Sequence, residues 1–161
     1  MKGSAVISRC GVWRYRLDRI VADSGPVYAF FGVNGSTATA NTNDQTVRKW
    51  HGFVDHWRGS RFIAGNAFGF RAKDVRALAS ASDPIGPLND RYLREIIAEA
   101  DILVPCWGSR DKLPKHLRPR LDEILSMLRA SWKPVRCLGL TASGDPKHPL
   151  TLGYATPLIK F

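Results

Sequence analysis

The sequence predicts an α/β protein, a three-layer α/β/α sandwich around a mainly parallel four-stranded central sheet. Short apolar runs bounded by turn residues alternate along the chain with segments whose apolar residues recur at helical spacing. Right-handed crossovers between parallel strands place the loops that follow the strands along one edge, which predicts where a ligand site lies. The 161 residues, 44% of them hydrophobic, are expected to form one domain spanning residues 1–161.

The expected core strands are four apolar runs at residues 27–33, 61–68, 102–107 and 135–140. Continuous apolar runs of this length are typical of a sheet that is covered on both faces. A further strand is expected near the N-terminus, because Trp13, Tyr15 and Leu17 alternate with polar residues, starting with Arg14. A period of two indicates a half-exposed strand, which we expect at the edge of the sheet.

Three longer helices are expected between these strands. The first follows an N-cap at Asn43 or Asp44, the second begins at Asn89 or Asp90, and the third has Pro119 in its first turn, where the missing N–H costs nothing. Residues 74–81 suit a shorter helix. The residues expected to face the core are Val47, Trp50, Val54 and Trp57, then Leu93, Ile96, Ile97 and Ala100, then Leu121, Ile124, Leu125 and Leu128.

The composition favours a polyanionic partner, with DNA or RNA first. There are 24 Lys and Arg against 14 Asp and Glu, a formal charge of +10. The alternative is a charge that serves solubility alone. Cys10, Cys106 and Cys137 have neither metal-ligand spacing nor the even number typical of a disulfide framework, so we expect reduced thiols and no metal site. No signal peptide or membrane-spanning run is recognisable, so a cytoplasmic protein without a membrane partner is expected. A monomer is also expected.

The predicted edge of the sheet gathers residues that lie at or after the ends of the four core strands. These are Asn34, Asn66, Trp107 with Gly108, and His148. Asn34-Gly35 is a turn sequence, because both residues tolerate positive φ. Three of these residues also have an ordinary alternative: a turn at Asn34 and at Asn66, and for His148 a loop side chain satisfied by the backbone.

Taken together, these strand ends resemble the uracil-DNA glycosylase superfamily. That family has a Gly-x-Asn/Asp-Pro loop, a strand ending in Asn, a Leu-Trp-Gly strand and a late His-Pro-Ser loop that carries a Leu wedge. The corresponding segments here, in the same order between about residues 27 and 154, are Gly32-Val33-Asn34-Gly35, Asn66, Cys106-Trp107-Gly108-Ser109 and His148-Pro149-Leu150-Thr151-Leu152. The resemblance implies a uracil-DNA glycosylase-like fold and a DNA N-glycosylase that needs no cofactor.

The chain also resembles a family of short, functionally uncharacterised bacterial and phage proteins. Those proteins have an Asn-Pro-Ser-Thr-Ala loop and a first strand that contains Arg-Tyr. The matching segments are Asn34-Gly35-Ser36-Thr37-Ala38 and Arg14-Tyr15-Arg16. This second resemblance implies no particular activity.

The glycosylase resemblance assigns roles to individual residues. It implies that Asn34 holds the attacking water or supports the cationic sugar, and that His148 donates a hydrogen bond to the base carbonyl. Asn66 would read the edge of the flipped base, and Leu152 would fill the gap in the DNA stack. The candidates for stacking on the base are Trp50, Phe53 and Phe68; a core position is the alternative for these aromatic residues and for Leu152.

Two departures from the glycosylase pattern concern the loop that begins at Gly32. Gly35 replaces the usual Pro, which predicts a more mobile loop. Ser36 occupies the position where strict uracil enzymes have the Tyr that excludes C5 substituents, so we expect room for a 5-substituted pyrimidine, such as a modified base of phage DNA. The alternative is that a side chain from another loop fills this space.

Basic residues near the predicted edge are candidates for phosphate contacts, namely Lys147, Arg110, Lys112 and Lys115. Two alternatives to a glycosylase stay open from the sequence. One is a nucleic-acid-binding module without catalysis, and the other is an enzyme that acts on free nucleotides, although no Gly-rich phosphate loop supports the latter.

Overall fold

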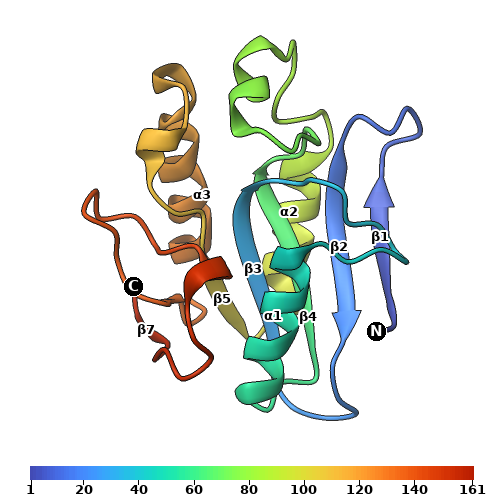
Figure 1. Ribbon diagram of the computed structural model, residues 1–161, viewed down its shortest axis with the longest axis vertical. Coiled ribbons are helices and arrows are strands. Elements are labelled where there is room, and N and C mark those ends of the chain that lie inside the picture. Colours follow the sequence, from blue (N-terminus) through green and yellow to red (C-terminus); the bar gives the residue numbers. More distant parts are fainter.

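The computed structural model describes residues 1–161 and contains a five-stranded mixed sheet with helices on both faces (Figure 1). The strand order is β1 (Gly3–Ile7), β2 (Arg14–Ile20), β4 (Arg61–Phe68), β3 (Val27–Asn34) and β5 (Ile102–Pro105). β3 pairs in parallel with β4 and β5, whereas β2 is antiparallel to both β4 and β1. The α/β class is confirmed, but the expected mainly parallel sheet of four strands is wrong in strand number and direction.

β2 is an internal strand, not the expected edge strand. β1 pairs along its outer side, with Ala5 opposite Leu17. β1 shows no apolar alternation, so the sequence does not predict the strand that pairs with the outer side of β2. As a result Arg14, expected on a half-exposed strand, is only 3% exposed, and Arg19 is completely buried.

The expected fourth core strand at residues 135–140 does not form. Val135 makes one parallel bridge to Leu103, and only β6 (Arg136–Cys137) continues as a strand, paired with β7 (Ile159–Lys160) in a separate antiparallel pair. Gly139 adopts a φ of +107°, a region open to glycine, and its carbonyl accepts from the backbone N–H of Lys147 at 2.9 Å. The chain therefore turns back on itself instead of extending the sheet.

The helices begin close to where the sequence predicts. α1 (Gln45–His56) is capped by Asp44, whose carboxylate accepts from the N–H of Val47 at 2.9 Å. α2 (Asn89–Glu99) begins at Asn89, and α3 (Pro119–Ala130) has Pro at its first position. None of these helices is both long and apolar enough to cross a membrane.

The sheet separates two cores because neighbouring residues of a strand point to opposite faces. On the α1 side, Phe30 and Phe62 pack with Trp50; on the other side, Phe31 and Ile63 pack with side chains of α2 and α3. The layers are thus helix, sheet and helix pair, visible in Figure 1 as α1 on one side of the strands and α2 and α3 on the other.

Four single-turn or short 3-10 helices connect these elements: η1 (Val75–Ser80), η2 (Arg110–Lys112), η3 (Lys115–Leu117) and η4 (Pro149–Thr151). η1 occupies most of the short helix expected at residues 74–81. η4 matters for the site, because it begins directly after His148.

Candidate functional site

A polar cavity of about 140 Å³ lies where β3 and β4 end. The carboxyl ends of parallel strands are the usual ligand edge of an α/β sheet. Six of the residues singled out from the sequence line it: Gly32, Asn34, Ser36, Trp50, Asn66 and His148. Four residues to which the sequence analysis gave no ligand-binding role complete the lining: Arg14, Val33, Asp44 and Thr46.

Asn34 is held in place through its amide nitrogen. Nδ2 donates to the carbonyl of Gly35 at 3.0 Å and to the carbonyl of Ala72 at 2.8 Å. Both amide hydrogens are thereby used, and Oδ1 remains as an acceptor. An aspartate, which has no donor when ionised, would make neither bond, so this loop selects the amide.

Asn66 is 2% exposed, yet its side chain makes no hydrogen bond within the protein. Its backbone carbonyl accepts from Nδ2 of Asn89 at 2.9 Å, which anchors the end of β4 from the α2 side. A Cβ at Gly32 would lie 2.9 Å from Oδ1 of Asn66, so the glycine makes room for this amide. A buried amide without a partner on a cavity wall is a group that a ligand can satisfy.

His148 precedes η4 and acts as its N-cap. Nδ1 accepts from the backbone N–H of Leu150 at 3.2 Å, so the proton of the neutral imidazole is on Nε2. Burial lowers the pKa of His148 and Lys112 lowers it further, while Asp44 opposes the shift. The local structure therefore favours a neutral imidazole with a donor at Nε2.

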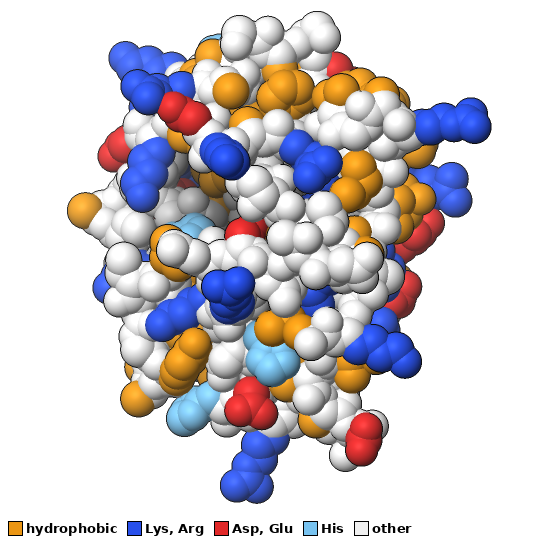
Figure 2. Space-filling model, turned by 45° about the vertical axis from the view of Figure 1, so that its right-hand side comes forward, with side chains coloured by type: hydrophobic (Ala, Val, Ile, Leu, Met, Phe, Trp, Pro, Cys, Tyr) orange, Lys and Arg blue, Asp and Glu red, His pale blue; other side chains and the backbone are white.

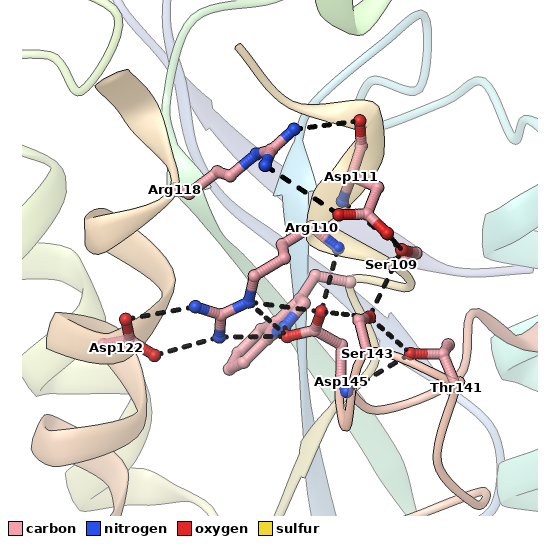
Figure 3. A network of polar contacts seen from close by, with 9 residues as sticks. Ser109, Arg110, Asp111, Arg118, Asp122, Thr141, Ser143 and Asp145 are labelled. Atoms are coloured by element: carbon pink, nitrogen blue, oxygen red, sulfur yellow. Dashed lines mark hydrogen bonds and ion pairs between the residues drawn. The ribbon is translucent and has the colours of Figure 1, made fainter. Parts of the chain in front are cut away.

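The loops that carry Gly108 and His148 are joined by a polar network around Asp145 (Figure 3). The Asp145 carboxylate is almost fully buried and accepts from the backbone N–H of Arg110 at 2.9 Å and from Oγ of Ser143 at 2.7 Å. The Arg110 guanidinium bridges Asp145 and Asp122. Burial raises the pKa of Asp145, but the bonds from Arg110 and Ser143, together with a weaker one from Trp107, outweigh it and leave the pKa low.

Trp50 lines the cavity from α1. Its ring stacks on Phe30 with 5.1 Å between centroids, and its indole N–H has no hydrogen-bond partner. Phe53, the other aromatic candidate on α1, is buried and packs edge-on against Tyr154. Of these two side chains, only Trp50 is available to a molecule in the cavity.

Three other predicted residues lie outside the cavity. Phe68 is 1% exposed in the core on the α2 and α3 side, so it is a packing residue. Gly35 lies behind the lining, against the Arg14 guanidinium. Leu152 lines a neighbouring groove that also contains Lys112, Lys147 and His148, so that groove adjoins the cavity at the histidine.

Arg14 is the most unusual residue of the lining. Nη1 donates to the carbonyl of Ala38 at 3.0 Å, Nε has no partner, and no carboxylate lies within ion-pair distance. Burial lowers the pKa of Arg14 to about 10; Asp44 opposes this shift, while Arg71 and Arg19 add to it. The guanidinium is thus charged at neutral pH but poorly compensated.

The sequence does not predict that Arg14 lines the cavity. Because β2 runs antiparallel to β4, its first residue lies beside the last residues of β4, at the ligand edge. That position follows from the antiparallel pairing of β2 with β4, which the sequence does not reveal.

The remaining candidate chemistry is limited by the residue types present. Cys106 is fully buried, and burial raises the pKa of its thiol to about 12, so it is no thiolate nucleophile at neutral pH. No group of three or more His, Cys, Asp and Glu side chains is arranged to hold a metal ion. The cavity offers positioned hydrogen-bonding groups and one buried cation.

The fold and the cavity define an α/β protein with a polar cavity at the carboxyl edge of its parallel strands. The chain belongs to the family described as "Protein of unknown function (DUF1643)", whose model matches residues 14–150. No curated protein and no solved structure matches the chain. The matched range includes every residue that lines the cavity.

Proposed function

We propose that this protein is a monofunctional DNA N-glycosylase with a uracil-DNA glycosylase-like fold, which takes one pyrimidine base into the cavity and hydrolyses its N-glycosidic bond. The observation that carries the proposal is the convergence of Asn34, Asn66 and His148 on one cavity of about 140 Å³. For comparison, an engineered cavity of about 150 Å³ binds benzene, so the space suits a single six-membered ring.

The free atoms of the site match the needs of this reaction. Cleavage of the bond develops positive charge on the sugar and negative charge on the departing base. Oδ1 of Asn34 has no partner and serves to orient a water, while Nε2–H of His148 serves as the donor to the base carbonyl. An amide is a poor base, so the rate enhancement rests on positioning and electrostatic stabilisation.

The hydrogen-bonding capacity of Asn66 and the face of Trp50 supply recognition of the base. The Asn66 amide offers one donor group and one acceptor on the cavity wall. Ser36 provides no bulky wall, which favours a pyrimidine with a substituent at C5 over plain uracil. The proposed substrate is therefore a modified pyrimidine in DNA.

The surface charge supports a nucleic-acid partner. Figure 2 shows Lys and Arg side chains around a hollow on one face of the molecule. Lys112 and Lys147 are exposed in the groove beside His148. Arg110 is instead engaged by Asp122 and Asp145, so the two lysines are the better candidates for phosphate contacts.

The test is release of bases from short DNAs that carry uracil, thymine or bulky 5-substituted cytosines, followed by alkaline cleavage at abasic sites. The wild type is expected to release a 5-substituted base. Asn34→Ala and His148→Ala are each expected to slow release by about 100-fold or more, the usual effect of removing one preorganised polar group.

A matched control is Phe53→Leu, a buried change on α1 outside the cavity, which is expected to leave the rate within about threefold of the wild type. Salt-sensitive DNA binding without abasic sites would instead identify a binding module. A strong preference for plain uracil would contradict the open C5 position.

A further inference from the structure

We propose that Arg14 is an oxyanion-binding residue, so that the molecule held in the cavity carries a carboxylate or phosphate group that pairs with the guanidinium. This inference rests on the proposed function only in taking the same cavity as the ligand site. It adds a charge requirement that neither the base-releasing chemistry nor the glycosylase resemblance supplies.

A comparison of the two buried arginines of β2 supports a ligand role for Arg14. Arg19 is fully satisfied: its guanidinium donates to the side chain of Asn43 and to backbone carbonyls that include those of Asp18, Thr39 and Thr42. Arg14 donates once, to Ala38. Both arginines donate to the loop between β3 and α1, but the bonds from Arg19 are sufficient to fix this loop. Arg14 is therefore not needed for that purpose.

Arg14 lines the cavity, and part of its hydrogen-bonding capacity is unmet. Nε is buried without a partner, and Nη2 makes no hydrogen bond although the residue is only 3% exposed. A guanidinium presents paired donors with the spacing of the two oxygens of a carboxylate or phosphate. An isolated buried charge is costly, and an oxyanion is the group that offsets this cost.

The loop at Gly35 is shaped around this guanidinium. A Cβ at Gly35 would lie 3.1 Å from both Cζ and Nε of Arg14, closer than a side chain normally packs. Gly35 does not have a positive φ, so space rather than backbone conformation accounts for the glycine. The absence of the usual Pro at this position is thus explained by the arginine behind the loop.

The surrounding charges leave the site available to an anion. Asp44 is the one carboxylate in the lining, and one of its oxygens caps α1 by accepting from Val47. It forms no ion pair with Arg14. Arg71 lies close enough to add positive potential, and its guanidinium donates to the carbonyl of Ser36.

Two sources of the oxyanion follow from where Arg14 lies. Beside Gly35 and Ser36, it would meet an anionic substituent at C5 of a pyrimidine. In a free nucleotide, it would meet the 5′-phosphate. Both sources share the pairing of a guanidinium with an oxyanion, and matched compounds distinguish them.

The experiment titrates the protein at pH 7.5 with two matched pairs of compounds. The first pair is uracil-5-carboxylate and uracil-5-carboxamide, which differ in charge and hardly in shape. The second pair is 2′-deoxyuridine 5′-monophosphate and 2′-deoxyuridine. We expect the anionic member of one pair to bind about 10- to 100-fold more tightly, the range of a charge-assisted hydrogen bond. The pair that shows the preference identifies the source.

The variants test whether Arg14 causes the preference. Arg14→Met is expected to abolish it, and Gly35→Ala to weaken it by displacing the guanidinium. Arg14→Met is also expected to unfold within about 3 °C of the wild type or above it, whereas the control Arg19→Met loses more than about 5 °C.

The proposal is overturned if neither pair shows a preference, if the preference survives Arg14→Met, or if Arg14→Met destabilises the protein as much as Arg19→Met. Base release from DNA is measured separately. Base release without an Arg14-dependent preference would leave the proposed function and remove this inference. An Arg14-dependent preference without base release would support the oxyanion site and remove the proposed glycosylase function.

Discussion

His148 illustrates how one backbone hydrogen bond determines what a side chain offers to a ligand. The bond from the N–H of Leu150 to Nδ1 requires an unprotonated nitrogen there. Protonation of the imidazole would break this bond and add charge beside Lys112. The cap of η4 and the neutral state of His148 therefore stabilise each other.

This coupling predicts a pH dependence of stability. The folded pKa of His148 is lowered, so the unfolded chain binds the proton more readily, and stability falls as the pH drops through the unfolded value of about 6.5. We expect the free energy of unfolding to fall more for the wild type than for His148→Asn between pH 7.5 and 5, measured by urea unfolding.

The Asn variant is matched, because its Oδ1 can still cap η4 while it carries no titrating group. The other three histidines are present in both proteins and cancel in the comparison. Parallel stability curves for the two proteins would contradict the proposed coupling.

Residue types predict much of the site, but not its charge. Asn34, Asn66 and His148 are recognisable because each lies near the end of an apolar run, or in the loop after one, and carries hydrogen-bonding groups. Arg14 and Asp44 are not, because their places in the lining depend on strand pairing and on the loop between β3 and α1. A polar residue in an alternating strand is indistinguishable by sequence from one that faces water.

Among the elements, the loops that hold the site depend on the Asp145 network. The carboxylate connects the start of η2 to the loop that leads to His148 (Figure 3). Its contacts with Arg110 and Ser143 are hydrogen bonds to a charged group that is nearly inaccessible to water. Such bonds are stronger than those between neutral partners.

We therefore expect Asp145→Asn to lower the free energy of unfolding by about 2 kcal/mol, the value for a charge-assisted bond discounted for the partly exposed Arg110. Thermal unfolding measures the loss, and base release should fall with it because His148 loses its support. The control Asp122→Asn removes the exposed partner of Arg110 and should cost at most about 1 kcal/mol. Equal losses in the two variants would show that burial of Asp145 is unimportant.

The predicted elements that form are those with a strong local period. β3, β4 and the three helices have continuous apolar runs or helical spacing with a cap or Pro at the start. β1 is missed because its five residues have no distinctive pattern. The strand predicted at residues 135–140 is too long, because the apolar run does not show that the chain turns at Gly139.

For the whole molecule, the excess of basic residues predicts salt-sensitive binding to DNA. Each phosphate that a Lys or Arg neutralises contributes a slope of about −0.9 to a plot of log K against log salt concentration. Lys112→Ala, beside His148, should reduce the magnitude of this slope by about one such contribution in a fluorescence titration. The control Arg94→Ala changes a residue of α2, the helix that packs on the face of the sheet away from α1. This change should leave the slope of the salt dependence unchanged. Equal effects of the two changes would indicate binding without a preferred face.

The hairpin of β1 and β2 has a consequence for which side chains can reach the cavity. A strand that joins a parallel sheet in the opposite sense contributes its beginning, not its end, to the ligand edge. Arg14 reaches the cavity in this way, on an element separate from the loops of Asn34 and His148. Substitutions at the start of β2 in this hairpin can therefore alter one wall of the cavity while the loops of Asn34 and His148 stay as they are.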